Sequence, residues 1–232
     1  MNQLTTQAIV LSRTNFGEAD RIVTFLTPDR GKISGMVKGV RKPKSKLAGG
    51  IELFSVSDIG FIPGRGEVST ITSTRLVRHY GNIVRDLNRT NLGYELIKNL
   101  NKATEDSPEE AYFDLLNQAF GALNDDSIDL DIIAAWFDAQ LLKQAGHTPN
   151  LHTDAEGVKL DAGGVYDFNF DSMCFQASQA GHASFKADHI KFLRLLFSGN
   201  PPMTLQKVQG ASALAAAVRS LLRSMLANFV RL

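Results

Sequence analysis

Turn residues cut the first 80 residues of this chain into five short runs rich in Ile, Val, Phe and Thr. After residue 80 the apolar residues instead recur at helical spacing. β-branched and aromatic runs bounded by Gly, Pro and Asn are typical of short strands. The predicted strands cover residues 8–11, 21–26, 32–37, 51–62 and 68–77.

Five strands in so short a stretch predict a small closed barrel, because closure removes the exposed strand edges that an open sheet would leave. We therefore predict a closed or nearly closed barrel as the N-terminal domain, residues 1–80, and the OB-fold is the commonest nucleic-acid-binding architecture of that size. Fold alone does not give function, since one architecture hosts many activities. The fold class expected for the whole chain is α+β.

The remainder, residues 81–232, is predicted to form a mostly helical domain. Ser107, Pro108 and Glu110 are placed as a helix start, with Ser107 as the cap. A third helix is expected to end at Gly146. Residues 147–183 lose the helical spacing and carry several glycines, so we expect an irregular or β-rich insertion there. Further helices follow near residues 190–197 and 214–229.

Charge divides unevenly along the chain, although the total is only +1. Residues 1–80 hold twelve Lys/Arg and six Asp/Glu, a net charge of +6. Residues 81–160 hold six against fourteen, a net charge of −8, and the rest of the chain is +3. Such asymmetry suggests that different parts meet different partners.

The strongest local feature is a cationic stretch, residues 32–46, with six Lys/Arg and no acidic residue. Pro43 and Ser45 cannot readily continue a strand, so we expect a mobile loop beside the barrel. Such a loop suits a phosphate backbone, because each contact releases condensed counterions. The predicted nucleic-acid-binding residues are Arg13, Arg21, Lys32, Lys38, Arg41, Lys42, Lys44, Lys46 and Arg65.

Four phenylalanines of the predicted barrel are available for stacking on bases, and we expect at least two of them to be core residues instead. They are Phe16, Phe25, Phe54 and Phe61. The alternative interpretation of the whole region is a solvated lysine-rich loop over a phenylalanine core.

Signals for an enzyme, a metal or a membrane are weak. Gly31-Lys32 resembles part of a phosphate loop, but Leu26 stands where that motif needs Gly. Cys174 is the only cysteine, and the histidine spacings match no strong zinc pattern. We therefore predict a non-enzymatic protein without cofactor or metal. No stretch is apolar enough to span a membrane and no secretory leader is evident, so a cytoplasmic location is expected.

Several motifs of this chain resemble the RecO family of recombination mediators. They are AIVL at 8–11, FGEADR at 16–21, GKI at 31–33, KGVR at 38–41 and GRG at 64–66, with Phe54 and, more weakly, FDxxLLxxxG at 137–146. The resemblance implies an N-terminal OB-fold and a helical C-terminal domain. It implies binding of single- and double-stranded DNA and annealing of complementary strands without nucleotide hydrolysis. The implied partners are a RecR-like protein, single-stranded-DNA-binding protein and, indirectly, RecA recombinase, which is loaded onto DNA.

The chain departs from the family pattern in the insertion. The resemblance implies that many family members carry four zinc-binding cysteines in this insertion, whereas this chain has only Cys174. Zinc, and any partner contact that needs a zinc module, are therefore not expected.

Two other functions fit the residues. An RNA-binding OB protein would use the same basic loop, because phosphate contacts carry no sequence information. A protein-interaction scaffold would use the acidic helical middle, with the basic loop incidental.

Overall fold

The structure is a computed structural model that describes residues 2–104, 110–178 and 185–230. The chain forms two compact units, Met1–Asp125 and Asp126–Leu232. The first unit holds the barrel together with two helices, so the helices that follow residue 80 are shared between the two units.

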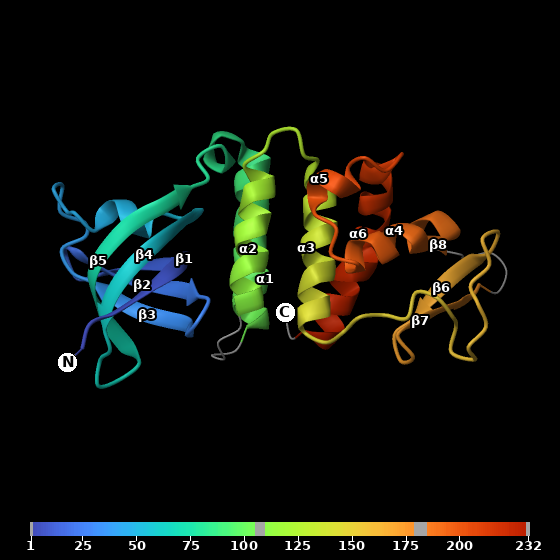
Figure 1. Ribbon diagram of the computed structural model, residues 1–232, viewed down its shortest axis with the longest axis horizontal. Helices are drawn as coiled ribbons and strands as arrows, with labels where there is room; N and C mark the ends of the chain where they lie inside the picture. The colour runs from blue at the N-terminus through green and yellow to red at the C-terminus, as the bar shows by residue number, and fades with distance from the viewer. Residues whose placement is uncertain (1, 105–109, 179–184, 231–232) are drawn as a thin grey trace. The chain divides into compact units, whose positions relative to one another are not determined.

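The first unit contains a closed five-stranded barrel, which confirms the predicted OB-like fold (Figure 1). Its strands close in the order β1-β2-β3-β5-β4, with β3 and β5 parallel and the other pairs antiparallel. They are β1 (Leu4–Phe16), β2 (Asp20–Thr27), β3 (Gly31–Val37), β4 (Ser55–Ile62) and β5 (Val68–His79).

Strict alternation along β3 places every second residue inside the barrel. Gly31, Ile33, Gly35 and Val37 are buried, and the residues between them are half-buried. Gly35 leaves room for Ile71, whose side chain would lie 2.5 Å from a Cβ at that position. The barrel core comprises Ala8, Val10, Val23, Phe25, Ile33, Val37, Val40, Ile51, Ile59, Phe61 and Ile71.

The connection from β3 to β4 contributes to this core as well. It contains a short 3₁₀ helix, η1 (Ala48–Ile51), which packs on β4 and β5. Val40 and Ile51 are both buried in the barrel cluster, and the Thr74 hydroxyl donates to the Leu47 carbonyl at 3.0 Å. The long connection is therefore anchored at both ends.

Two helices cover part of the barrel's outside. A second 3₁₀ helix, η2 (Ile83–Arg85), leads into α1 (Leu87–Ala103), and α2 (Glu110–Leu123) follows. Ile9 of β1 pairs with Leu26 of β2, and both residues are on the outer side of the barrel. They are nevertheless buried, in agreement with the contacts of α1 with β1 and of α2 with β2. The predicted start signal at Ser107 and Pro108 lies outside the described residues.

Phe54 joins the barrel to these helices. Its ring meets those of Tyr94 and Phe120 edge-on, each at 5.4 Å between centroids. Gly93 makes the approach of α1 possible, because a Cβ there would lie 2.6 Å from the Phe54 ring. Phe54 is itself held at φ +54°, an uncommon conformation for a bulky residue.

The second unit is built around α3 (Leu130–Gln144), which is buried on nearly all sides. It packs on α4 (Ala187–Phe197), α5 (Pro202–Leu205) and α6 (Ala211–Phe229). Asp129 caps α3, accepting from the backbone N–H of Asp131 at 2.8 Å. Gly146, at φ +82°, follows the end of α3 as predicted.

The predicted insertion is partly β structure. It contains β6 (Val165–Asn169) and β7 (Cys174–Ala177), which form an antiparallel sheet with β8 (Phe185–Lys186) in the order β7-β6-β8. Among the helices that the structure describes, none is long and apolar enough to cross a membrane.

Candidate nucleic-acid interface

One part of the barrel's outer surface is left open by α1 and α2. Along β1, β2 and β3 the register pairs Ser12 with Thr24, Thr14 with Ile22, Thr24 with Ser34 and Ile22 with Met36. These residues alternate with inward ones, so they share the outer side, and all are exposed or half-buried. We call this surface the open face; it comprises Ser12, Thr14, Phe16, Ile22, Thr24, Ser34 and Met36.

A bulge in β1 separates the open face from the covered one. The register shifts between Val10 and Ser12, so that Ile9 and Ser12 both lie outside. Ile9 and its partner Leu26 are buried, whereas Ser12 is exposed. The outer surface thus changes, along the same strands, from an apolar part that the helices cover to an open part with both hydroxyl and apolar side chains.

The cationic loop, residues 38–46, lies at the end of β3. It folds as consecutive turns, with Lys42 N–H donating to the Gly39 carbonyl at 3.2 Å and Ser45 N–H to the Lys42 carbonyl at 3.0 Å. Its five basic side chains are all exposed: Lys38, Arg41, Lys42, Lys44 and Lys46. Such a density of solvated positive charge suits a polyanion.

Hydrogen bonds tie the cationic loop to the β1–β2 hairpin. Gly39 N–H donates to the Asp20 carboxylate at 2.7 Å, and Arg41 N–H donates to the Ala19 carbonyl at 2.9 Å. The Arg41 guanidinium also reaches the Gly17 carbonyl at 3.3 Å. We call these three contacts the clasp. The sequence led us to expect a loop beside the barrel, and the structure shows that its first residues are anchored to the hairpin, with Val40 in the core. The mobility of the rest of the loop stays a prediction.

The other four predicted binding residues lie in different surroundings. Arg65 is exposed in the turn between β4 and β5, three residues before Val68, which the register places next to Ser34. Arg13 faces η1 instead, donating to Glu52 at 2.9 Å and to the Ile51 carbonyl at 3.3 Å. Arg21 donates to the Asn15 side chain at 3.1 Å.

Lys32 lies at the far end of β3 from the cationic loop. Six residues of extended strand separate it from Lys38, about 20 Å. Its ammonium donates to the Asn101 carbonyl of α1 at 3.2 Å. It lines a polar hollow of about 520 Å³, whose other lining residues are Thr24, Ser34, Glu67 and Asn101. Thr24 and Ser34 belong to the open face, so the hollow continues that face.

Three of the four candidate stacking residues are core residues. Phe25, Phe54 and Phe61 are at most 3% exposed, whereas Phe16 is 51% exposed at the end of β1. Apart from Phe16, the residues of the open face were not among those predicted from the sequence to contact nucleic acid. Their alternation, Ser12-x-Thr14-x-Phe16 on β1 and Ile22-x-Thr24 on β2, is the signal that marks an outer strand surface.

The insertion of the second unit does not offer a zinc site in its described part. Cys174 is buried with its sulfur 3.1 Å from the Ser172 hydroxyl, and the His147 ring stacks on Phe229. His189 accepts a backbone hydrogen bond from Lys186. No three His, Cys, Asp or Glu side chains gather within the described ranges, and His182 lies outside them.

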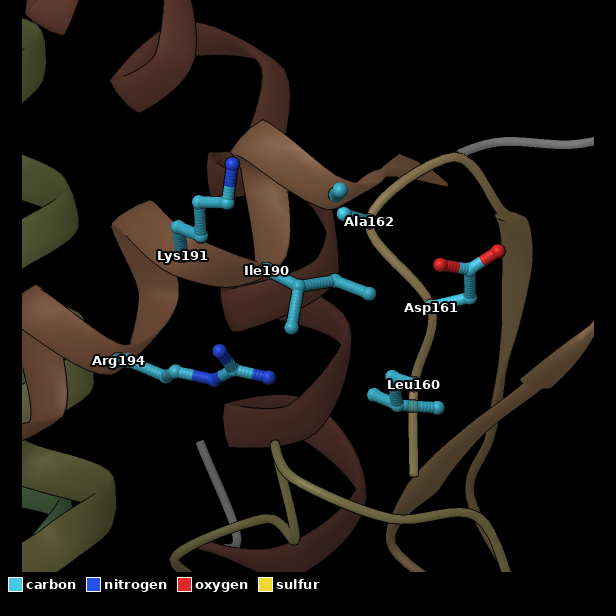
Figure 2. Close-up of a pocket in the computed structure, with 7 residues that line it drawn as sticks. Leu160, Asp161, Ala162, Ile190, Lys191 and Arg194 are labelled. Atoms are coloured by element: carbon cyan, nitrogen blue, oxygen red, sulfur yellow. The ribbon is translucent and has the colours of Figure 1, made fainter. Parts of the chain in front are cut away.

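Where the insertion meets α4 there is a small cavity of about 90 Å³ (Figure 2). Leu160, Asp161 and Ala162 line one side, and Ile190, Lys191 and Arg194 of α4 line the other. Arg194 is bound to the Leu151 carbonyl through two nitrogens, at 2.6 and 2.9 Å. One carboxylate beside two cations does not match the ligand set that zinc requires.

Comparison with known proteins identifies related sequences for both parts of the chain. Residues 1–80 match the family described as recombination protein O N terminal, and residues 91–230 match recombination protein O C terminal. Relatives include the "DNA repair protein RecO" of Dehalococcoides mccartyi strain 195, 34% identical over 63% of this chain, and that of Desulfatibacillum aliphaticivorans, 28% identical over 78%.

The protein of Rhodopirellula baltica, also named "DNA repair protein RecO", is 35% identical over 61% of this chain. The matched region spans 57% of the Dehalococcoides protein, 53% of the Rhodopirellula protein and 70% of the Desulfatibacillum protein. Because the two family matches together cover most of the sequence, with a closed barrel in the first, this chain belongs to the recombination protein O (RecO) family.

Proposed function

We propose that this protein is a DNA-binding recombination mediator that acts in DNA repair. The observation that supports this most is the cationic loop, which carries five exposed basic side chains and whose backbone is hydrogen-bonded to the β1–β2 hairpin beside the open face of the barrel. In OB-folds, the face of strands 2 and 3 and the neighbouring loops commonly bind oligonucleotides. The names of its relatives, each a DNA repair protein, agree with this assignment.

In this proposal, two regions of the surface bind different groups of the nucleic acid. The cationic loop binds phosphates, and Arg65 adds a charge from the β4–β5 turn. The open face and the polar hollow with Lys32 take sugars and bases, since their hydroxyl, amide and carboxylate groups are hydrogen-bonding partners. The charge of Arg13 is compensated by Glu52, whereas Arg21 donates to the neutral Asn15 side chain and contributes positive potential.

Annealing of complementary strands follows from charge alone. A cationic surface brings two polyanions together by lowering their mutual repulsion, so no nucleotide is consumed. We propose accordingly that the protein is not an enzyme. It would help load a recombinase onto single-stranded DNA coated by single-stranded-DNA-binding protein, with a RecR-like partner, as the family resemblance implies.

An annealing assay with two complementary labelled oligonucleotides tests the proposal. We expect the purified protein to accelerate annealing without ATP, and a variant with Arg41, Lys42, Lys44 and Lys46 changed to Ala to lose most of that acceleration. A requirement for nucleotide would contradict the mediator function. If RNA of equal length displaces bound DNA at equal or lower concentration, the RNA-binding alternative would be favoured.

A further inference from the structure

We propose that Phe16 is a stacking platform for an unpaired base, which makes the interface selective for single-stranded over duplex DNA. The inference rests on the proposed binding of DNA at the cationic loop. It adds a residue that reads whether the strand is paired, which phosphate contacts alone cannot do.

Phe16 is half exposed, so the fold gains only part of the burial energy that a phenylalanine can supply. Its side chain is 51% exposed, whereas the other three aromatic residues of strands and loops 1–62 are buried in the barrel or against α1 and α2. Full burial of a Phe side chain is worth about 1.5–3 kcal/mol. A phenyl ring left largely in water on a binding surface is therefore available to a ligand.

The ring is held on an ordered hairpin. Phe16 is the last residue of β1 and pairs with Asp20, the first residue of β2. Gly17 makes the turn at φ +55°, a conformation that favours glycine. Asp20 accepts from Gly39, and the Gly17 carbonyl accepts from Arg41, so the clasp fixes both sides of Phe16. The backbone that carries the ring therefore has little conformational entropy to lose when a base stacks on it.

The surroundings of Phe16 suit both the phosphate and the base of a nucleotide. The clasp places the cationic loop next to it, and phosphates bound there hold the strand beside the hairpin. On the open face behind it, Ile22 and Met36 pair as an apolar strip, with Thr14 opposite Ile22. A base that points from the loop toward the open face meets the Phe16 ring first.

Selectivity follows because a paired base has no free face. In a duplex each base already stacks on its neighbours, and exposing one requires unstacking and unpairing. A single strand offers its bases without that cost, and aromatic stacking accepts any base. Duplex DNA can still bind the cationic loop through its phosphates.

The test compares Phe16→Ala with the wild type on three probes of equal length: oligodeoxythymidine, an abasic oligonucleotide with the same phosphates, and a duplex. We expect the substitution to weaken binding of oligodeoxythymidine roughly 5- to 150-fold. Binding of the abasic and duplex probes, and the salt dependence, are expected to stay unchanged. Leu87→Ala, which removes another exposed apolar side chain of the first unit, is the control and is expected to leave all three affinities unchanged.

Phe16→Trp gives a direct signal. Trp136, the single tryptophan of the chain, is 2% exposed, so a new indole at position 16 is read against a constant background. We expect oligodeoxythymidine to quench the fluorescence of this indole, and the abasic probe to leave the fluorescence unchanged. Circular dichroism verifies that each variant is folded.

Four results would overturn the inference. Equal binding of oligodeoxythymidine by Phe16→Ala and wild type, or equal wild-type affinity for the thymidine and abasic probes, would refute stacking while DNA binding stands. An indole at position 16 that no probe quenches would do the same. Failure of the wild type to bind any of the three probes would instead overturn the proposed function together with the inference.

Discussion

The cationic loop provides the sharpest quantitative test of the proposed interface. Each phosphate neutralised on a single strand contributes about 0.7 to the slope of log K against log salt. Within the described part of the chain, Arg41, Lys42, Lys44 and Lys46 are exposed and form no ion pair, so they are available to phosphate. Changing all four to Ala is expected to lower the slope by roughly 2 to 3 units.

That change is large in practice. When salt is raised from about 50 to 200 mM, a slope difference of about 2.8 means that the wild type loses roughly 50-fold more affinity than the variant. Titration of a fluorescent oligodeoxythymidine at four salt concentrations measures it. The melting temperature is expected to move little, because solvated side chains contribute little to stability.

A matched control separates local contacts from total charge. Changing Lys98, Lys102, Lys159 and Lys207 to Ala removes the same charge from exposed positions outside the loop. We expect that control to keep nearly the wild-type slope. Unchanged affinity and slope in the loop variant, with its fold retained, would refute the reasoning and direct attention to Arg219 and Arg223 of α6.

Three further predictions concern stability and metal content. Gly93→Ala is expected to destabilise the first unit by about 1–3 kcal/mol in urea unfolding, because its Cβ would meet the Phe54 ring; Gly121→Ala, with open space around it, is expected to cause no loss and serves as control. Asp129→Ala is expected to cost about 0.5–2 kcal/mol through loss of the α3 cap, and Asp129→Ser to restore most of it; equal stability of all three proteins would contradict the capping assignment. Elemental analysis after dialysis against a weak chelator is expected to find no stoichiometric zinc, and about one zinc per chain would contradict our interpretation of the insertion.

Local patterns predicted the five strands because clear turn residues bound them. The predicted extents were partly wrong: β1 runs from Leu4 to Phe16 and not only over 8–11, and β4 begins at Ser55, after η1, and not at residue 51. The core-facing residues of α2, such as Leu116 and Phe120, followed from helical spacing. Helical spacing did not separate the buried from the exposed apolar residues of α1, in which Leu87 is 74% exposed and Tyr94 50% exposed. Their spacing matched a helix face, but burial in α1 is decided by which side meets the barrel, and Gly93 beside Phe54 fixes that side.

The candidate site was predictable in its charges and not in its geometry. The run of Lys and Arg is visible in one stretch of sequence. The clasp joins residues 17–20 to residues 39–41, and that pairing depends on how β1, β2 and β3 align. The same holds for Arg13, whose attachment to Glu52 is a contact between distant segments. Which of the four phenylalanines is exposed also required the closed barrel.

Footprinting of lysine acetylation, read by mass spectrometry, tests the central claim most directly. The protein is acetylated briefly with and without saturating oligodeoxythymidine. We predict that DNA protects Lys38, Lys42, Lys44 and Lys46, whereas Lys98, Lys102 and Lys207 react at the same rate in both samples. Loop lysines that react equally fast with and without bound DNA would contradict the assignment of the interface to the cationic loop.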